Sequence, residues 1–263
     1  MKRVMRLVTA TVLTFGALLS RAPPGLAQTE VDLALVLAVD ISGSMDPEEQ
    51  RIQREGFVLA FQSPEVHDAI RKGVLARITV IYAEWAGSFV QHVVVPWTVI
   101  ERPEHAMEFA AKLAETPIRR GPRTSVSGAI DFGVRLLAQS DAEPLRRVID
   151  ISGDGVNNQG RGVVQARDEA VAQGITINGL PLMLNRPGGS WDTEGLDNYF
   201  RDCVIGGPGA FVIPVRERQQ FAEAIRTKII REIAGLAPSR LLQRAQSVAP
   251  MDCTSPGSFY GRN

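Results

Sequence analysis

The sequence predicts an α/β fold, a three-layer sandwich with helices on both faces of a mostly parallel six-stranded sheet that has one antiparallel edge strand. Apolar, strand-like runs alternate with helical segments along most of the chain, which is typical of a parallel sheet covered by helices. Aliphatic residues are plentiful, whereas Phe, Trp and Tyr make up only 6% of the chain. The runs at 76–86 and 88–100 are separated by a short turn at Gly87-Ser88, so we expect them to form an antiparallel hairpin.

The expected elements follow in a regular order from a first strand at 31–39. A helix begins after it at Asp46-Pro47-Glu48-Glu49, since an acidic N-cap, a proline at the first helical position and acids in the first turn favour a helix start, and it ends near Gln62. The other expected strands are 76–86, 88–100, 146–152, 175–183 and 209–215, and the other expected helices are at about 103–115, 125–138, 161–173, 192–201 and 217–234. Open sheets of this kind bind ligands at the carboxyl ends of their strands.

The N-terminus has the pattern of a secretory signal peptide of the bacterial Sec type. Lys2, Arg3 and Arg6 precede an apolar stretch at 7–20, and small residues near Ala27 offer a cleavage site. An uncleaved anchor is the weaker alternative, because this apolar stretch is too short to span a bilayer. We therefore predict a signal peptide at 1–27 and a periplasmic or secreted mature protein.

The mature chain is predicted to consist of one domain at 28–236 and an irregular, Pro-, Ser-, Gly- and Gln-rich tail at 237–263. Removal of residues 1–27 takes away four of the 29 basic residues and none of the 29 acidic ones, which leaves a net charge of −4. Nucleic-acid binding requires a basic face, so it is not expected here. No later stretch is apolar for long enough to predict stable membrane insertion. The oligomeric state cannot be read from these features.

The chain has two cysteines, Cys203 and Cys253. In an oxidising compartment they can form a disulfide that ties the tail to the domain. The alternative is two unpaired thiols, and the sequence leaves both open.

Oxygen-bearing side chains gather in three segments. Asp40, Ser42 and Ser44 come directly after the first strand, Thr124 precedes a helix, and Asp154 ends a later strand. Taken singly, each has an ordinary explanation as a cap or a turn-former. Taken together, two carboxylates and three hydroxyls suit a hard divalent cation such as Mg²⁺ or Mn²⁺.

These three segments resemble the metal-ion-dependent adhesion site of von Willebrand factor type A domains. That pattern is Asp-x-Ser-x-Ser, then a distant Thr before a helix, then a distant Asp followed by Gly, and this chain fills all its positions in order. The resemblance covers roughly 31–234 and implies the Rossmann-like fold of that superfamily. The phrases DISGSMD, GAIDFG, ISGDGVNN and YFRDCVIGGPGAFV are also similar to a group of exported bacterial von Willebrand factor A-like proteins of unassigned function (DUF1194-like).

The resemblance implies a function in binding. In the family the serines ligate the metal directly and the second aspartate commonly acts through water, so a coordination position remains for an outside oxygen. We therefore expect a protein partner that offers a Glu or Asp carboxylate. No nucleophile–base pair emerges, so an enzyme is not expected. The alternatives are a metal-dependent hydrolase with Asp154 or Asp46 as its base, and an envelope scaffold whose metal is only structural.

Two further interpretations concern the surroundings of this site. Trp191 and Arg201 form a partner-selecting rim if the loop at 187–192 covers the carboxyl edge of the sheet, and otherwise the nearby aromatic residues belong to the core. Gly155 and Asn157-Asn158 are interpreted as turn-formers rather than ligands.

Overall fold

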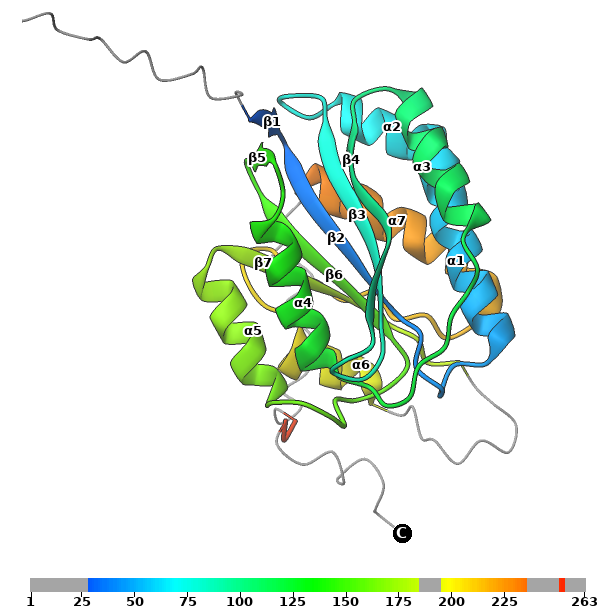
Figure 1. Cartoon of the computed structure of the whole chain (residues 1–263), viewed down its shortest axis with the longest axis vertical. Helices are drawn as coiled ribbons and strands as arrows, with labels where there is room; N and C mark the ends of the chain where they lie inside the picture. The colour runs from blue at the N-terminus through cyan, green and yellow to red at the C-terminus, as the bar shows by residue number, and fades with distance from the viewer. Residues whose placement is uncertain (1–27, 185–194, 236–250, 254–263) are drawn as a thin grey trace, which may run out of the picture.

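A five-stranded sheet forms the centre of the computed structural model, which describes residues 28–184, 195–235 and 251–253 (Figure 1). Its strand order is β4-β3-β2-β6-β7. Four strands are parallel and β4 pairs antiparallel with β3 at one edge. The strands are β2 (Leu33–Asp40), β3 (Ile78–Trp85), β4 (Gln91–Ile100), β6 (Arg147–Gly153) and β7 (Ile175–Pro181). The predicted α/β class, the mostly parallel sheet and the antiparallel hairpin are confirmed.

Helices cover both faces of this sheet, as Figure 1 shows. One face packs against α1 (Pro47–Gln62), α2 (Pro64–Arg71), α3 (Pro103–Glu115) and α7 (Phe221–Ala234), and the other against α4 (Val126–Ala138), α5 (Val163–Ala172) and α6 (Leu196–Tyr199). Strand β2 contributes to both cores, because successive side chains of a strand point to opposite faces. Leu35 and Leu37 lie in the first core, and Val36 and Ala38 lie in the second.

The sixth predicted strand, 209–215, is a correction. This segment runs beside β7 and contacts it only through isolated bridges, from Gly179 to Val212 and from Leu182 to Val215. Pro181 lies between these bridges and has no N–H to donate, so a continuous ladder cannot form. The sheet therefore has five regular strands rather than six.

Three short elements were not predicted. Helix α2 begins directly after α1, where Ser63 accepts a hydrogen bond from the Val66 amide at 3.3 Å and Pro64 occupies the first turn. This repeats the cap-and-proline signal that was recognised at the start of α1. Strands β1 (Thr29–Val31) and β5 (Ala142–Pro144) form a separate parallel pair.

The disulfide alternative holds for the two cysteines. Cys203, in the π-helical turn η1 (Phe200–Val204), is bonded to Cys253 with a Cα–Cα distance of 5.6 Å. The Met251 amide also donates to Asp202 at 3.1 Å, so residues 251–253 are held against the domain. Residues 1–27 and most of the tail lie outside the described part of the chain, and the signal peptide stays a prediction. Within the described part, no helix is long and apolar enough to cross a membrane.

Candidate metal centre

Asp40 is the most deeply buried of the candidate ligands. It ends β2, and its side chain is 0% exposed. Its Oδ1 accepts a hydrogen bond of 2.6 Å from the Ser42 amide, so the chain turns tightly at the end of the strand. Its Oδ2 makes no hydrogen bond of normal geometry with any described residue. A buried carboxylate oxygen without a partner is costly, and a bound cation is one way to offset that cost.

A chain of hydroxyl contacts connects this turn with the end of β6. The Ser42 and Ser44 hydroxyls are 2.8 Å apart, and the Ser44 hydroxyl donates to Asp154 Oδ1 at 2.6 Å. The backbone of Gly153 also packs tightly on Asp40, because a Cβ there would lie 2.9 Å from Asp40 Oδ2. The end of β2 and the end of β6 therefore meet at one place, although more than 100 residues separate them in the sequence.

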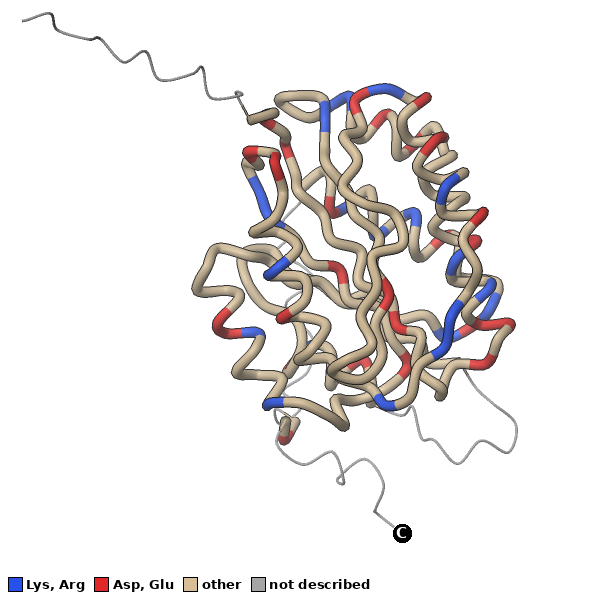
Figure 2. The backbone as a smooth tube through the Cα atoms, viewed as in Figure 1, with Lys and Arg blue, Asp and Glu red and all other residues tan. Residues whose placement is uncertain are grey.

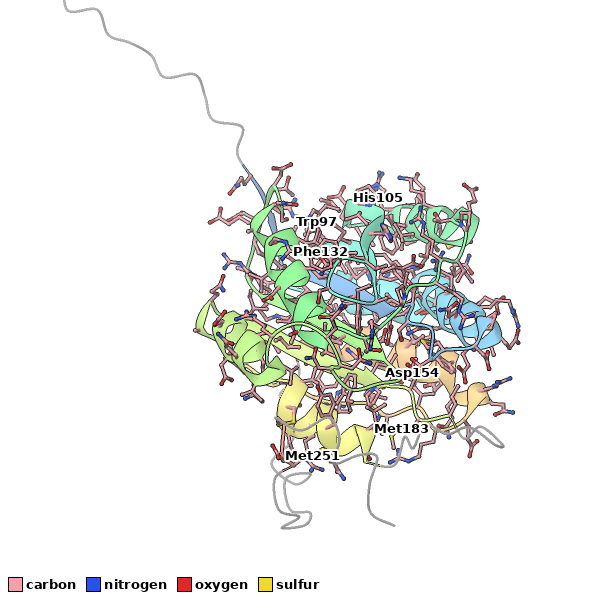
Figure 3. The ribbon with its side chains drawn as sticks, turned by 60° about the horizontal axis from the view of Figure 1, so that its bottom comes forward. Trp97, His105, Phe132, Asp154, Met183 and Met251 are labelled. Atoms are coloured by element: carbon pink, nitrogen blue, oxygen red, sulfur yellow. A yellow bond between two sulfur atoms is a disulfide. The ribbon has the colours of Figure 1, made fainter. Side chains whose placement is uncertain are left out.

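The segment before α4 brings Thr124 to the same edge. The Gly121 amide donates to the Ile41 carbonyl at 2.9 Å, which places this segment against the turn that follows Asp40. A Cβ on Gly155 would lie 3.6 Å from Thr124 Oγ1, so the threonine hydroxyl lies beside the segment that contains Asp154. Figure 3 turns this edge forward and labels Asp154. The structure thus brings together all the candidate ligands: Asp40, Ser42, Ser44, Thr124 and Asp154.

The electrostatics of the site fit a cation. Burial raises the pKa of Asp40 well above its ordinary range, and the negative charge of Asp154 raises it further. Hydrogen bonds from Ser42 and from the Asp154 amide act in the opposite direction. Among the described residues, no group of three or more His, Cys, Asp or Glu side chains is placed to hold a metal ion. A cation here would depend on two carboxylates and three hydroxyls, an oxygen-only set that suits Mg²⁺ or Mn²⁺.

Asn158 has a larger role than the turn-former that was expected. Its side-chain Oδ1 accepts a hydrogen bond from the Thr124 backbone amide at 2.9 Å, and its backbone amide donates to the Thr124 carbonyl at 2.9 Å. These two bonds fix the backbone of Thr124 from both sides. The only sequence signal was the Asn-Asn pair that closely follows Asp154-Gly155, and its connection to Thr124 depends on the fold.

The proposed rim receives no support from the described residues. Trp191 lies outside the described part of the chain. Arg201 makes local contacts, donating to Asp202 and to Asn198. Tyr199 and Phe200 are buried at 3% and 0% exposure, as the alternative interpretation expected of core aromatics.

A family model described as "Protein of unknown function (DUF1194)" matches residues 30–237. The chain belongs to the DUF1194 family. This agrees with the resemblance that was noted in the sequence phrases. Among curated proteins, none matches this DUF1194 chain.

Solved structures similar to this DUF1194 protein have the von Willebrand factor A fold. Proximal thread matrix protein 1 from the mussel byssus superposes with a TM-score of 0.55 at 11% identity, over 79% of this chain and 49% of that one. The pilus adhesin SpaC from Lactobacillus rhamnosus GG gives 0.56 at 12% identity, over 77% and 31% of the two chains. A von Willebrand factor type A protein from Catenulispora acidiphila gives 0.50 at 15%, over 77% and 43%. The chain thus spans half or less of these proteins.

One of the structures of the byssus protein is described as having a zinc-occupied metal-ion-dependent adhesion site, and it matches with a TM-score of 0.53 at 12% identity. At such identities the likeness shows the fold alone.

Proposed function

We propose that this DUF1194 protein binds a divalent cation at the candidate metal centre and uses it to dock a protein partner through a Glu or Asp carboxylate. The single observation that carries the proposal is Asp40, a fully buried carboxyl whose Oδ2 makes no hydrogen bond of normal geometry with a described residue and whose pKa is raised by burial and by Asp154. A cation at this carboxyl offsets both effects, because it supplies the opposite charge beside a buried acid.

The residues divide the work of such a site. Asp40 and Asp154 supply the negative charge, and the hydroxyls of Ser42, Ser44 and Thr124 supply neutral oxygens. Mg²⁺ is the favoured ion, and it would supply an electrophilic centre. It takes six oxygen ligands and usually retains exchangeable waters, so an outside carboxylate oxygen could complete its coordination shell. Asn158 holds Thr124 in position through its two hydrogen bonds. This arrangement suits docking better than a closed structural site.

We place this activity in the periplasm or outside the cell. The disulfide between Cys203 and Cys253 supports that location, because disulfides persist in oxidising compartments. The predicted signal peptide supports it as well. Among the similar structures, the byssus matrix protein and the pilus adhesin have names that denote assembly or attachment outside the cell.

Titration calorimetry of the chain 28–263 with Mg²⁺ and with Mn²⁺ tests the proposal. We expect saturable binding that is lost in Asp40→Asn and kept in the control Asp141→Asn, which changes an exposed aspartate before β5. Repeating the titration with acetate supplies the outside carboxylate. Absence of binding in the wild type both with and without acetate would overturn the proposal.

The same variants separate the two alternatives. In a metal-dependent hydrolase, Asp40→Asn removes turnover of a substrate. In a scaffold with a structural metal, Asp40→Asn chiefly lowers the melting temperature of the metal-loaded protein. Carboxylate ligands then bind neither the wild type nor the variant. In the proposed function, it removes binding of carboxylate ligands while the metal-free protein stays folded.

A further inference from the structure

A segment rich in arginine lies against the metal centre. Residues 116–125 connect α3 to α4 and contain Arg119, Arg120 and Arg123, just before Thr124. Arg120 donates to the carbonyls of Gly43 at 2.9 Å and Met45 at 2.8 Å, which are part of the turn that follows Asp40. Figure 2 shows basic residues on this connection. The segment therefore borders the place where a partner's carboxylate would enter.

The arginines of this edge fall into two sets. Arg161, Arg216 and Arg218 are neutralised by Asp131, Asp197 and Asp46, at 2.6, 2.6 and 3.0 Å. By contrast, Arg119, Arg120 and Arg123 are exposed, and within the described part of the chain no acidic side chain forms an ion pair with any of them. Arg120 is engaged by backbone carbonyls, so Arg119 and Arg123 remain available. This local excess of positive charge stands out in a chain with 29 basic and 29 acidic residues.

Arg123 adopts a backbone conformation that residues other than glycine rarely adopt. Its φ is +67°, and among the described residues only Ala76 shares a positive φ without being glycine. Such conformations persist where the surroundings fix them, and they gather at binding sites. Here the Gly87 amide donates to the Pro122 carbonyl at 3.1 Å, and a Cβ on Gly87 would lie 3.3 Å from Arg123 Cβ. The neighbouring turn therefore holds Arg123 in place.

Phe89 lies on that neighbouring turn, between β3 and β4, and is 95% exposed. The turn is anchored to the segment that follows Asp154, since the Ser88 amide donates to Gln159 Oε1 at 2.9 Å. It also packs against the arginine segment, where a Cβ on Gly121 would lie 2.8 Å from Val90 Cγ1. An exposed aromatic next to free arginines is the composition of an energetically important protein contact.

We propose that Arg119, Arg123 and Phe89 form a docking surface for an extended, acidic segment of the partner, which presents several carboxylates rather than one. One carboxylate occupies the metal centre, others pair with Arg119 and Arg123, and an apolar side chain packs on Phe89. Guanidinium groups suit this task because their fork of donors matches a carboxylate. The proposal rests on the proposed metal function and defines the class of partner.

Fluorescence anisotropy with three labelled peptides of equal length tests this surface. The peptides carry one Glu, four Glu, or four Glu and one Phe in a Gly/Ser background, and each is measured with Mn²⁺ and with EDTA on the chain 28–263. We expect the four-Glu peptide to bind at least tenfold more tightly than the one-Glu peptide, and the Phe to add a further gain that Phe89→Ser removes. The variant Arg119→Gln/Arg123→Asn should weaken the four-Glu peptide by about 3- to 30-fold and leave Mn²⁺ binding unchanged.

The variants are chosen so that misfolding cannot imitate the result. Both arginines are exposed, and Asn tolerates the positive φ at position 123 better than Arg does. The control Arg71→Gln changes an exposed arginine at the end of α2 and should alter nothing.

Equal affinity for the one-Glu and four-Glu peptides, or an unchanged affinity in the double variant, would overturn the inference. Tighter arginine-dependent binding to phosphatidylglycerol vesicles than to the four-Glu peptide would overturn it in favour of an anionic membrane. Failure of Mn²⁺ to bind defeats the metal function alone, because the ratio of peptide affinities in EDTA still reports on the arginines.

Discussion

Two buried carboxylates on neighbouring strands, Asp40 on β2 and Asp150 on β6, meet opposite circumstances. Both are almost fully shielded from solvent, at 0% and 1% exposure. Asp150 has the Lys228 ammonium at 2.6 Å, and the same ammonium contacts Glu232 at 2.5 Å. Asp40 forms no ion pair with any described residue, and its Oδ2 has no hydrogen bond of normal geometry with one. One acid is neutralised from within the fold, and for the other we propose neutralisation by a bound cation.

Burial and pKa alone do not distinguish these two acids. The pKa of Asp150 is raised to about 7, because burial and the charge of Glu232 raise it and Lys228 only partly opposes them. The pKa of Asp40 is raised for the same main reason. What separates them is position, because Asp150 lies in the middle of β6 opposite Leu37, under α7, whereas Asp40 ends its strand among loops. The two acids therefore differ in their partners and in their position rather than in the direction of the pKa shift.

The strongest test of this contrast removes the internal cation. We expect Lys228→Met to lower the free energy of unfolding by about 3–5 kcal/mol, because Asp150 and Glu232 remain buried without their positive charge. Urea denaturation followed by circular dichroism measures the loss. The control Lys112→Met changes an exposed lysine of α3 and should cost less than about 0.5 kcal/mol. A loss below about 1 kcal/mol at Lys228 would mean that the cluster is not neutralised by its lysine.

A second test uses pH on the same cluster. The folded-state pKa of Asp150 is about 7, above the ordinary value of 3.8, so between these values the folded state holds a proton that the unfolded state releases. The contribution of this group to stability is therefore full below about pH 4 and is lost as pH rises through 7. We expect Asp150→Asn to flatten the fall in unfolding free energy between pH 4 and 8. An unchanged slope, with flattening by Glu232→Gln instead, would assign the proton to Glu232.

Each of the two regions contains an asparagine that holds a neighbouring residue in place, and these two asparagines give a smaller and more selective test. Asn178 donates to Glu232 at 3.1 Å in the cluster of Asp150, Lys228 and Glu232. Asn158 accepts a hydrogen bond from the Thr124 amide at the metal centre. We expect Asn158→Ala to weaken Mn²⁺ binding about tenfold, as the loss of a group that orients a ligand does. Asn178→Ala should instead lower the unfolding free energy by about 1–2 kcal/mol and leave the metal affinity unchanged. Calorimetry and urea denaturation of both variants would contradict the contrast if the effects were exchanged.

The sequence predicted the parts of this molecule that follow from local pattern and general topology. Asp40 and Asp154 each end an apolar run, and parallel strands bring their carboxyl ends to one edge, so their meeting could be expected before any coordinates. The start of α1 was equally predictable, since Asp46, Pro47 and Glu49 form a local signal, and the structure shows a capping box between Asp46 and Glu49. Helix α2 carries the same kind of signal, with Ser63 as its N-cap and Pro64 in its first turn.

The rest depended on contacts between residues distant in sequence. Lys228 and Glu232 look like an ordinary helical pair of the i, i+4 kind, and nothing local indicates that Asp150 will face them under the sheet. The break at Pro181 becomes visible only when the partner segment is known. Likewise, the positive φ of Arg123 is imposed by the turn at Gly87, which no propensity at position 123 records.

The smallest expected effect is a gain in the free energy of unfolding rather than a loss, and it concerns Asp40 itself. Asp40→Asn replaces a buried charge by a neutral amide whose oxygen can still accept from the Ser42 amide. In EDTA we expect the variant to be as stable as the wild type or more stable by up to about 1 kcal/mol, because a binding site often costs its protein stability. Urea denaturation in EDTA and in Mn²⁺ measures the balance, and Mn²⁺ should stabilise only the wild type. A loss of more than about 2 kcal/mol in EDTA would place Asp40 with Asp150, as an acid that the fold itself requires.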